Sequence, residues 1–104
     1  MGRSAIHPGE HLADAIAAAG LTSAKLARDI RVPANRVSGI LHGRRAITAD
    51  TALRLGRYFG TSAAFWMNLQ QLYELRRAEQ AIGAGLKQIP RERGRTGLLS
   101  QSRA

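Results

Sequence analysis

Apolar residues recur at spacings of three and four through the first 82 positions, and proline, glycine and hydroxyl residues interrupt this pattern at short intervals. Such a period places the apolar side chains on one face of a helix, whereas a strand would alternate them. A hydroxyl or proline marks each helix start, and a glycine marks most helix ends. We therefore predict an all-α chain with helices at 8–19, 23–30, 33–42, 49–59 and from 61 or 62 to about 82.

The apolar positions of the first four predicted helices are expected to face one core. In the fourth helix these positions are Ala52, Leu53, Leu55 and Phe59. The last predicted helix carries a broader apolar stripe than one small domain can cover. We therefore predict that this stripe also forms a two-fold interface with a second copy; its residues are Phe65, Trp66, Leu69, Leu72 and Tyr73.

The end of the chain has a different composition. Residues 83–104 contain four glycines and a proline, and five basic residues stand against one acidic residue. No helical period remains there. We expect a folded domain over residues 1–82 and a flexible basic tail over 83–104. The tail is either a solvated extension or a segment that contacts DNA or a protein partner.

Composition narrows the class of protein. A chain of 104 residues with 44% hydrophobic residues can form one domain with one modest core. Sixteen Lys and Arg against seven Asp and Glu give a net charge of +9, which attracts polyanions such as nucleic acid or serves solubility alone. Cysteine is absent, and no apolar run approaches a membrane span or a signal peptide. We expect a cytoplasmic protein with no membrane partner.

The second and third predicted helices form the most specific pattern. Each has eight to ten residues, and the turn between them is too short for an antiparallel hairpin. This arrangement is typical of a helix-turn-helix, whose second helix enters the major groove of DNA. Residues 23–45 carry six basic side chains and one acidic side chain, which agrees with docking on phosphates.

The first turn of the predicted helix 33–42 is expected to face the bases. An asparagine amide there can pair with adenine, an arginine can reach guanine or a phosphate, and small residues leave room for the groove floor. The predicted base-reading residues are Pro33, Ala34, Asn35, Arg36 and Gly39. Helix N-termini and flanking basic groups would position the DNA backbone; the predicted phosphate contacts are Thr22, Ser23, Lys25, Ser38, Arg44 and Arg45.

Other chemistry has weak support in the sequence. His7 and His11 are four residues apart and could share a helix face with Glu10, but a zinc site needs three or four ligands, no third His is near and Cys is absent. No nucleophile and base have a recognisable spacing, and no phosphate-binding loop is present. We expect no metal, no cofactor and no enzymatic activity, and we expect His42 to contact the end of its own helix or a phosphate.

The runs HPGEHLADAI and LARDIRVPANRVSGILHGRRAITADTALRLGRYFGTSAAFWMNLQQLYEL resemble the HigA-type, or VapI-like, antitoxins. The similarity covers about residues 6–77. It implies a five-helix, lambda-repressor-like (Xre/Cro) domain that binds its own operator as a homodimer and represses its operon. It also implies a complex with a HigB-type toxin, a RelE-like nuclease that cleaves mRNA. One residue departs from the wider superfamily, because Arg31 stands where a glycine with positive φ is usual.

Two other functions fit the residues. The chain could be a solitary Xre-family transcriptional regulator without a toxin. Alternatively, it could be an inhibitor that binds only protein, with its basic face on the acidic surface of a partner. Binding to DNA that weakens steeply with salt would separate both DNA-binding functions from the inhibitor.

Overall fold

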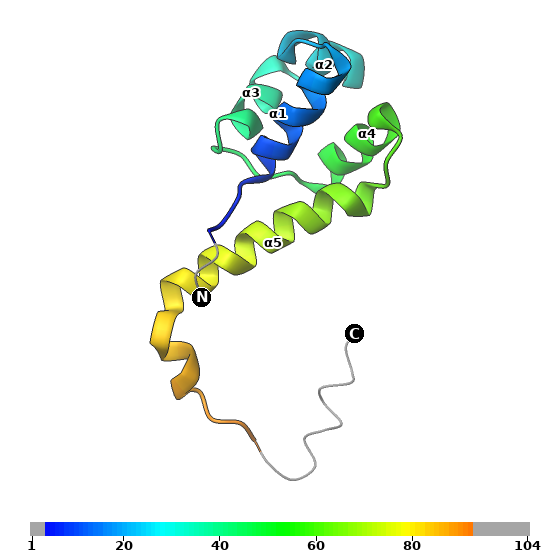
Figure 1. Ribbon diagram of the computed structural model, residues 1–104. Coiled ribbons are helices and arrows are strands. Elements are labelled where there is room, and N and C mark those ends of the chain that lie inside the picture. The colour runs from blue at the N-terminus through cyan, green and yellow to red at the C-terminus, as the bar shows by residue number, and fades with distance from the viewer. Residues whose placement is uncertain (1–3, 93–104) are drawn as a thin grey trace.

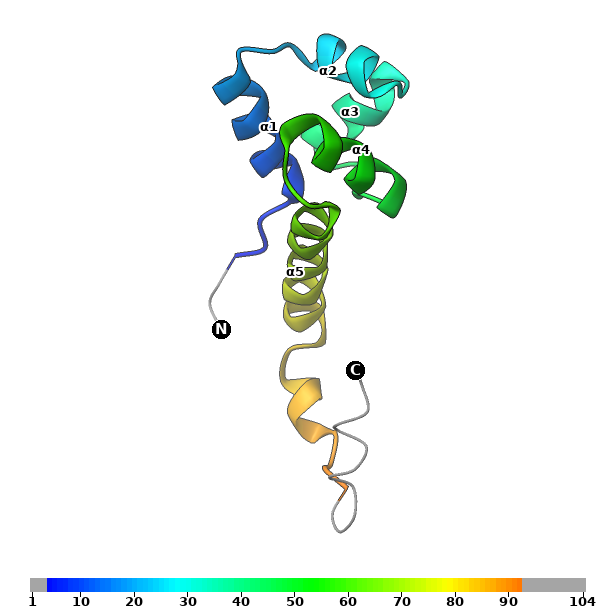
Figure 2. The same ribbon diagram turned by 90° about the vertical axis from the view of Figure 1, so that its right-hand side faces the viewer.

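The computed structural model describes residues 4–92. In this part of the chain, five α-helices are followed by one short 3-10 helix, and no strand is present. Helices α1 to α4 form a compact body, and α5 starts under this body and extends away from it (Figures 1 and 2). The predicted all-α fold is thus confirmed. The bounds are α1 Pro8–Ala19, α2 Ser23–Ile30, α3 Ala34–Leu41, α4 Ala49–Phe59, α5 Ala63–Ile82 and η1 Gly83–Gln88.

Local capping chemistry explains where most helices begin and end. The hydroxyls of Thr22, Thr48 and Ser62 accept hydrogen bonds from backbone N–H groups in the first turns of α2, α4 and α5. Gly20 and Gly60 end α1 and α4 with φ of 69° and 75°. Because these signals lie within a few residues of each helix end, the predicted bounds of α1, α2 and α4 agree with the structure.

Helix α3 is shorter than predicted by one residue at each end. Pro33 has an extended backbone and is the N-cap of α3, so it does not lie in the first turn. His42 follows the last helical residue, and its Nδ1 lies 2.8 Å from the carbonyl oxygen of Ser38. The expected contact of His42 with the end of its own helix is therefore present.

Every α-helix contributes to one core. Its members are nearly free of solvent contact, and the largest of them, Trp66, is 2% exposed. One prediction is wrong: Leu53 is 64% exposed. The buried face of α4 is centred between Ala52 and Leu55, and Leu53 points well away from it. The core residues are Leu12, Ile16, Leu26, Ala27, Ile30, Val32, Val37, Ile40, Ile47, Ala52, Leu55 and Trp66.

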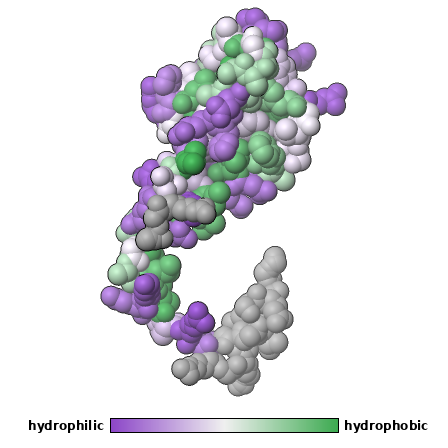
Figure 3. Space-filling model, viewed as in Figure 1, coloured by the Kyte–Doolittle hydropathy of each residue, from purple (hydrophilic) through white to green (hydrophobic). Residues whose placement is uncertain are grey.

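The stripe on α5 divides into a core residue and surface residues. Trp66 donates a hydrogen bond from Nε1 to Thr61 Oγ1 at 2.9 Å and packs edge-on against Phe65. Its own chain covers it, so it has almost no surface for a second copy, and its assignment to an interface is corrected. Phe65 and Leu72 are exposed, and Leu69 and Tyr73 are half-buried. Hydrophobic surface gathers along α5 and around η1 (Figure 3).

The loop between α3 and α4 is attached to α5 through a buried amide. Gln70 is buried, and its Oε1 accepts a hydrogen bond from the Ile47 N–H at 2.8 Å. Its Nε2 donates to Glu74 at 2.9 Å, so both ends of the amide are satisfied. The position of this loop therefore depends on α5.

The start of the predicted tail is helical. Residues Gly83–Gln88 form η1, which is exposed along its whole length. This short helix continues from α5 because Gly83, with φ of 54°, lets the chain turn at the end of α5. The remainder of the predicted tail, residues 93–104, lies outside the described residues.

His7 joins the start of α1 to two other parts of the fold. Its Nδ1 accepts a hydrogen bond from the Gly9 N–H at 2.9 Å, and its ring meets Tyr73 of α5 edge-on at 4.8 Å. Burial lowers the pKa of His7 below its ordinary 6.5, although a hydrogen bond with the Arg45 backbone and the charge of Glu10 oppose this shift. The folded chain therefore favours neutral His7.

Lowering the pH should destabilise the protein through His7. Its pKa is lower in the folded chain than in the unfolded chain, so the stabilisation is complete above about pH 6.5 and is lost as the pH falls through and below that value. Unfolding in urea between about pH 7.5 and 5.5 measures the slope of the free energy of unfolding against pH. His7→Asn keeps a capping oxygen and retains His11 and His42, so its slope should be shallower. Equal slopes in the two proteins would contradict the assignment to His7.

Candidate nucleic-acid interface

The second and third helices form a rigid pair. Residues 31–33 join them, and the Val32 N–H donates to the Ala27 carbonyl at 3.0 Å across this turn. Arg31 has φ of 64° and ψ of 49°, so an arginine does occupy the left-handed conformation that usually favours glycine. The strain costs on the order of 1 kcal/mol. The turn fixes the angle between α2 and α3.

The back of α3 is anchored in the core while its start is exposed. Val37 and Ile40 are each 1% exposed. By contrast, Pro33, Ala34 and Asn35 are all exposed at the N-terminal end of the helix. Three predicted base-reading residues therefore form an accessible surface on an immobilised helix, which is the geometry that a major-groove helix needs.

Gly39 does not belong to this accessible surface. It is buried, and a Cβ atom placed on it would lie 2.8 Å from both Cγ and Cδ of Arg45. The carbonyl oxygen of Gly39 also accepts hydrogen bonds from the N–H groups of Arg44 at 2.8 Å and Arg45 at 3.1 Å. The prediction of Gly39 as a base-reading residue is therefore corrected, because the Arg45 side chain covers this position.

The predicted phosphate contacts differ in how exposed they are. Thr22, Lys25, Arg44 and Arg45 are exposed, whereas Ser23 and Ser38 are half-buried. Some of these groups already have partners. Lys25 pairs with Asp29 at 2.9 Å, and the Thr22 hydroxyl accepts a hydrogen bond from the Lys25 N–H at 3.1 Å. The two arginines after α3, Arg44 and Arg45, are exposed cations.

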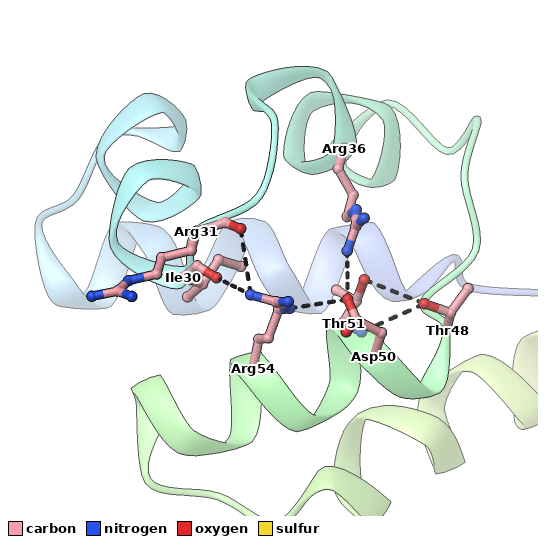
Figure 4. Close-up of polar contacts among 7 residues, drawn as sticks. All are labelled: Ile30, Arg31, Arg36, Thr48, Asp50, Thr51 and Arg54. Atoms are coloured by element: carbon pink, nitrogen blue, oxygen red, sulfur yellow. Dashed lines mark hydrogen bonds and ion pairs between the residues drawn. The ribbon is translucent and has the colours of Figure 1, made fainter.

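Arg36 lies in an ion-pair cluster that the sequence did not predict. Its Nη1 is 2.6 Å from Asp50 Oδ2, and Arg54 Nε is 3.0 Å from the same oxygen (Figure 4). Hydrogen bonds from Arg54 and then from Arg36 lower the pKa of the Asp50 carboxyl below its ordinary value, so it is charged at neutral pH. Asp50 is an acidic residue in the first turn of α4, and this position alone accounts for it only through the helix dipole. Nothing local indicated a contact with a residue fourteen positions earlier.

The described residues offer little for other chemistry. Among residues 4–92, no three or more His, Asp or Glu side chains lie close enough together to hold a metal ion. Within the same range, no helix is both long enough and apolar enough to cross a bilayer. The exposed start of α3, with the exposed Arg44 and Arg45 beyond the end of that helix, is accordingly the feature with the clearest chemical use, which is contact with a polyanion.

Comparison with known proteins supports this use. The helix-turn-helix family model matches residues 12–66. Virulence-associated protein I of Dichelobacter nodosus is 48% identical over 77 residues, which cover 73% of this chain and 71% of that protein.

Solved structures agree with this result. An addiction module antidote protein of the HigA family from Coxiella burnetii is 40% identical, has a TM-score of 0.82, and is matched over 88% of this chain and 100% of its own. The Pseudomonas aeruginosa antitoxin HigA, solved with the higBA promoter, is 45% identical with a TM-score of 0.79, over 84% of this chain and 96% of its own.

The fold and the exposed start of α3 thus define a DNA-binding protein of the helix-turn-helix class. The similarity extends beyond the helix-turn-helix pair to α1 and α5, because the matches to solved structures cover more than four fifths of the chain. Within the class, the chain belongs to the HigA, or VapI-like, family.

Proposed function

We propose that this chain is the antitoxin of a type II toxin–antitoxin system. It binds the operator of its own operon as a homodimer, represses that operon, and neutralises a RelE-like, mRNA-cleaving HigB toxin. The observation that carries the DNA-binding part is the exposed start of α3 on a helix whose back is buried, together with the exposed Arg44 and Arg45 just beyond the end of that helix. A relative that was solved with the higBA promoter supports DNA binding by this chain.

The interface divides into reading and positioning groups. Asn35 presents an amide to an adenine edge, and Pro33 and Ala34 let the backbone approach thymine methyl groups. Arg44 and Arg45 contact phosphates on the flank of the groove, which orients α3 without reading the sequence. Thr22 and the start of α2 meet a second phosphate through backbone N–H groups.

The second copy is proposed to pack on α5. Phe65 and Leu72 are exposed there, and Leu69 and Tyr73 are half-buried beside them. A two-fold axis through this surface would relate the two copies of α3 by symmetry. Such a dimer reads half-sites about one helical turn apart, roughly 34 Å. Residues 1–82 then form one DNA-binding and dimerisation domain.

The DNA-binding part is tested by titrating the protein with the duplex upstream of its own gene over a series of salt concentrations. The logarithm of the affinity should fall linearly with the logarithm of the salt concentration. Arg44→Ala and Arg45→Ala should each weaken all sequences alike and reduce that slope by about 1. Arg57→Ala, which removes an exposed arginine at the far end of α4, is the matched control and should leave the slope unchanged. Weak binding that does not depend on salt would reject DNA recognition.

The toxin part has a separate test. The product of the neighbouring open reading frame should co-purify with this chain and lose its mRNA-cleaving activity in the complex. If the two proteins do not associate while operator binding is retained, the chain acts as a solitary Xre-family transcriptional regulator.

A further inference from the structure

A carboxylate lies among the arginines next to the proposed DNA-binding surface. Asp50 shares one hollow of the surface with three arginines, which are Arg36, Arg45 and Arg54. Its side chain is 55% exposed, so burial does not require it to be paired. An exposed negative charge at this place opposes the binding of phosphates. Its presence there calls for a role in addition to stabilising the start of α4.

Arg54 links the Asp50 carboxylate to the backbone at the end of α2. Arg54 Nη1 donates to the carbonyl oxygens of Ile30 at 2.8 Å and Arg31 at 3.3 Å, at the C-terminal end of α2. Arg54 Nε donates to Asp50 Oδ2 at 3.0 Å. The backbone end of α2, Arg54 and Asp50 therefore form a connected chain of hydrogen bonds (Figure 4).

Arg36 is the last residue in this series of hydrogen bonds. Its Nη1 donates to the same Asp50 oxygen at 2.6 Å, and its side chain is still 31% exposed. A guanidinium carries five N–H donors in a rigid fork, and Asp50 engages only one of its nitrogens. Donors therefore remain for a base edge or a phosphate while the direction of the side chain is already fixed.

We propose that Asp50 is a positioning residue that determines specificity by holding Arg36 in one orientation for DNA. The proposal rests on the DNA-binding function above. Without Asp50, Arg36 would lose rotamer freedom only on binding, which weakens the cognate complex. Without the carboxylate charge, phosphates of any sequence would be attracted more strongly. Loss of Asp50 therefore changes cognate and random affinity in opposite directions.

Asp50→Asn tests this pair of effects. One probe is the duplex that the wild-type protein selects from a random-sequence library, and the other is a shuffled duplex of the same composition. Affinity for the selected duplex should fall, affinity for the shuffled duplex should rise about two- to threefold, and the ratio between them should fall about tenfold. Thermal unfolding of the variant verifies that it is folded.

Two further variants separate positioning from charge. Asp14→Asn removes the same charge from an exposed site on α1, and it should leave the ratio unchanged. In an Arg36→Ala background, Asp50→Asn should no longer change the ratio, because Asp50 acts through Arg36.

Several outcomes would overturn the proposal. These are an equal change in both affinities, an undiminished effect of Asp50→Asn in the Arg36→Ala background, and a rise in the ratio, which would mean that Asp50 withholds Arg36 from DNA. Failure of the proposed function would look different. In that case the wild-type protein would select no duplex from the library.

Discussion

Replacing Trp66 with alanine should lower the free energy of unfolding by about 3–5 kcal/mol, because a large buried aromatic side chain is lost from the core. The indole is 2% exposed, and its N–H donates to Thr61 at 2.9 Å. Its ring also packs near Phe59 of α4 and Phe65 of α5, so the cavity would lie where these helices meet. Urea unfolding followed by circular dichroism measures the loss.

Leu72→Ala is the control for Trp66→Ala. Leu72 lies on the same helix but is 49% exposed, so its truncation should lower the folding stability of a single chain by less than about 1 kcal/mol. It should instead weaken the proposed homodimer. Unfolding at several protein concentrations separates the two effects, because association makes the midpoint depend on concentration. If Trp66→Ala weakened only the dimer, the assignment of Trp66 to the core would be wrong.

Asn35→Ala should weaken binding to the cognate operator by about 1–3 kcal/mol and leave binding to random DNA nearly unchanged. Asn35 is exposed in the first turn of α3, and no residue in the described part of the chain bonds to its side-chain amide. Its removal therefore leaves the fold intact and deletes only the proposed contact with adenine. Titration of the operator and of a shuffled duplex measures both affinities.

The control for this variant is Gln71→Ala, which removes an exposed amide from α5. Both affinities should be unchanged in this control. An unaltered ratio of cognate to random affinity in Asn35→Ala would mean that a different part of α3 faces the bases.

Much of the fold could be predicted because its signals are local. Thr22, Thr48 and Ser62 cap helices that begin at the next residue, and Gly20 and Gly60 end helices by adopting positive φ. The predictions that were wrong depend on packing between helices. Leu53 and Trp66 are both large and apolar at helical spacing, and only the contacts of α4 and α5 with the body decide that one is exposed and the other buried.

The candidate site was harder to predict for the same reason. The helix-turn-helix pattern places Asn35 at the exposed start of α3, because capping and apolar spacing determine that position. The contacts of Arg36 with Asp50 and of Arg45 with Gly39 cross from one element to another. Their existence depends on how the loop after α3 returns to the body, and spacing along the chain does not determine that path.

The hydrogen bond between Gln70 and Ile47 has a consequence for assembly. The loop after α3, which we propose presents Arg44 and Arg45 to DNA, is bonded at its far end to α5, the helix that we assign to subunit pairing. In this proposal, α5 supports both the subunit contact and the loop that contacts DNA. The angle at which two copies of α5 cross would then determine the distance between the two copies of α3. Residues that never contact DNA would therefore determine the spacing of the operator half-sites.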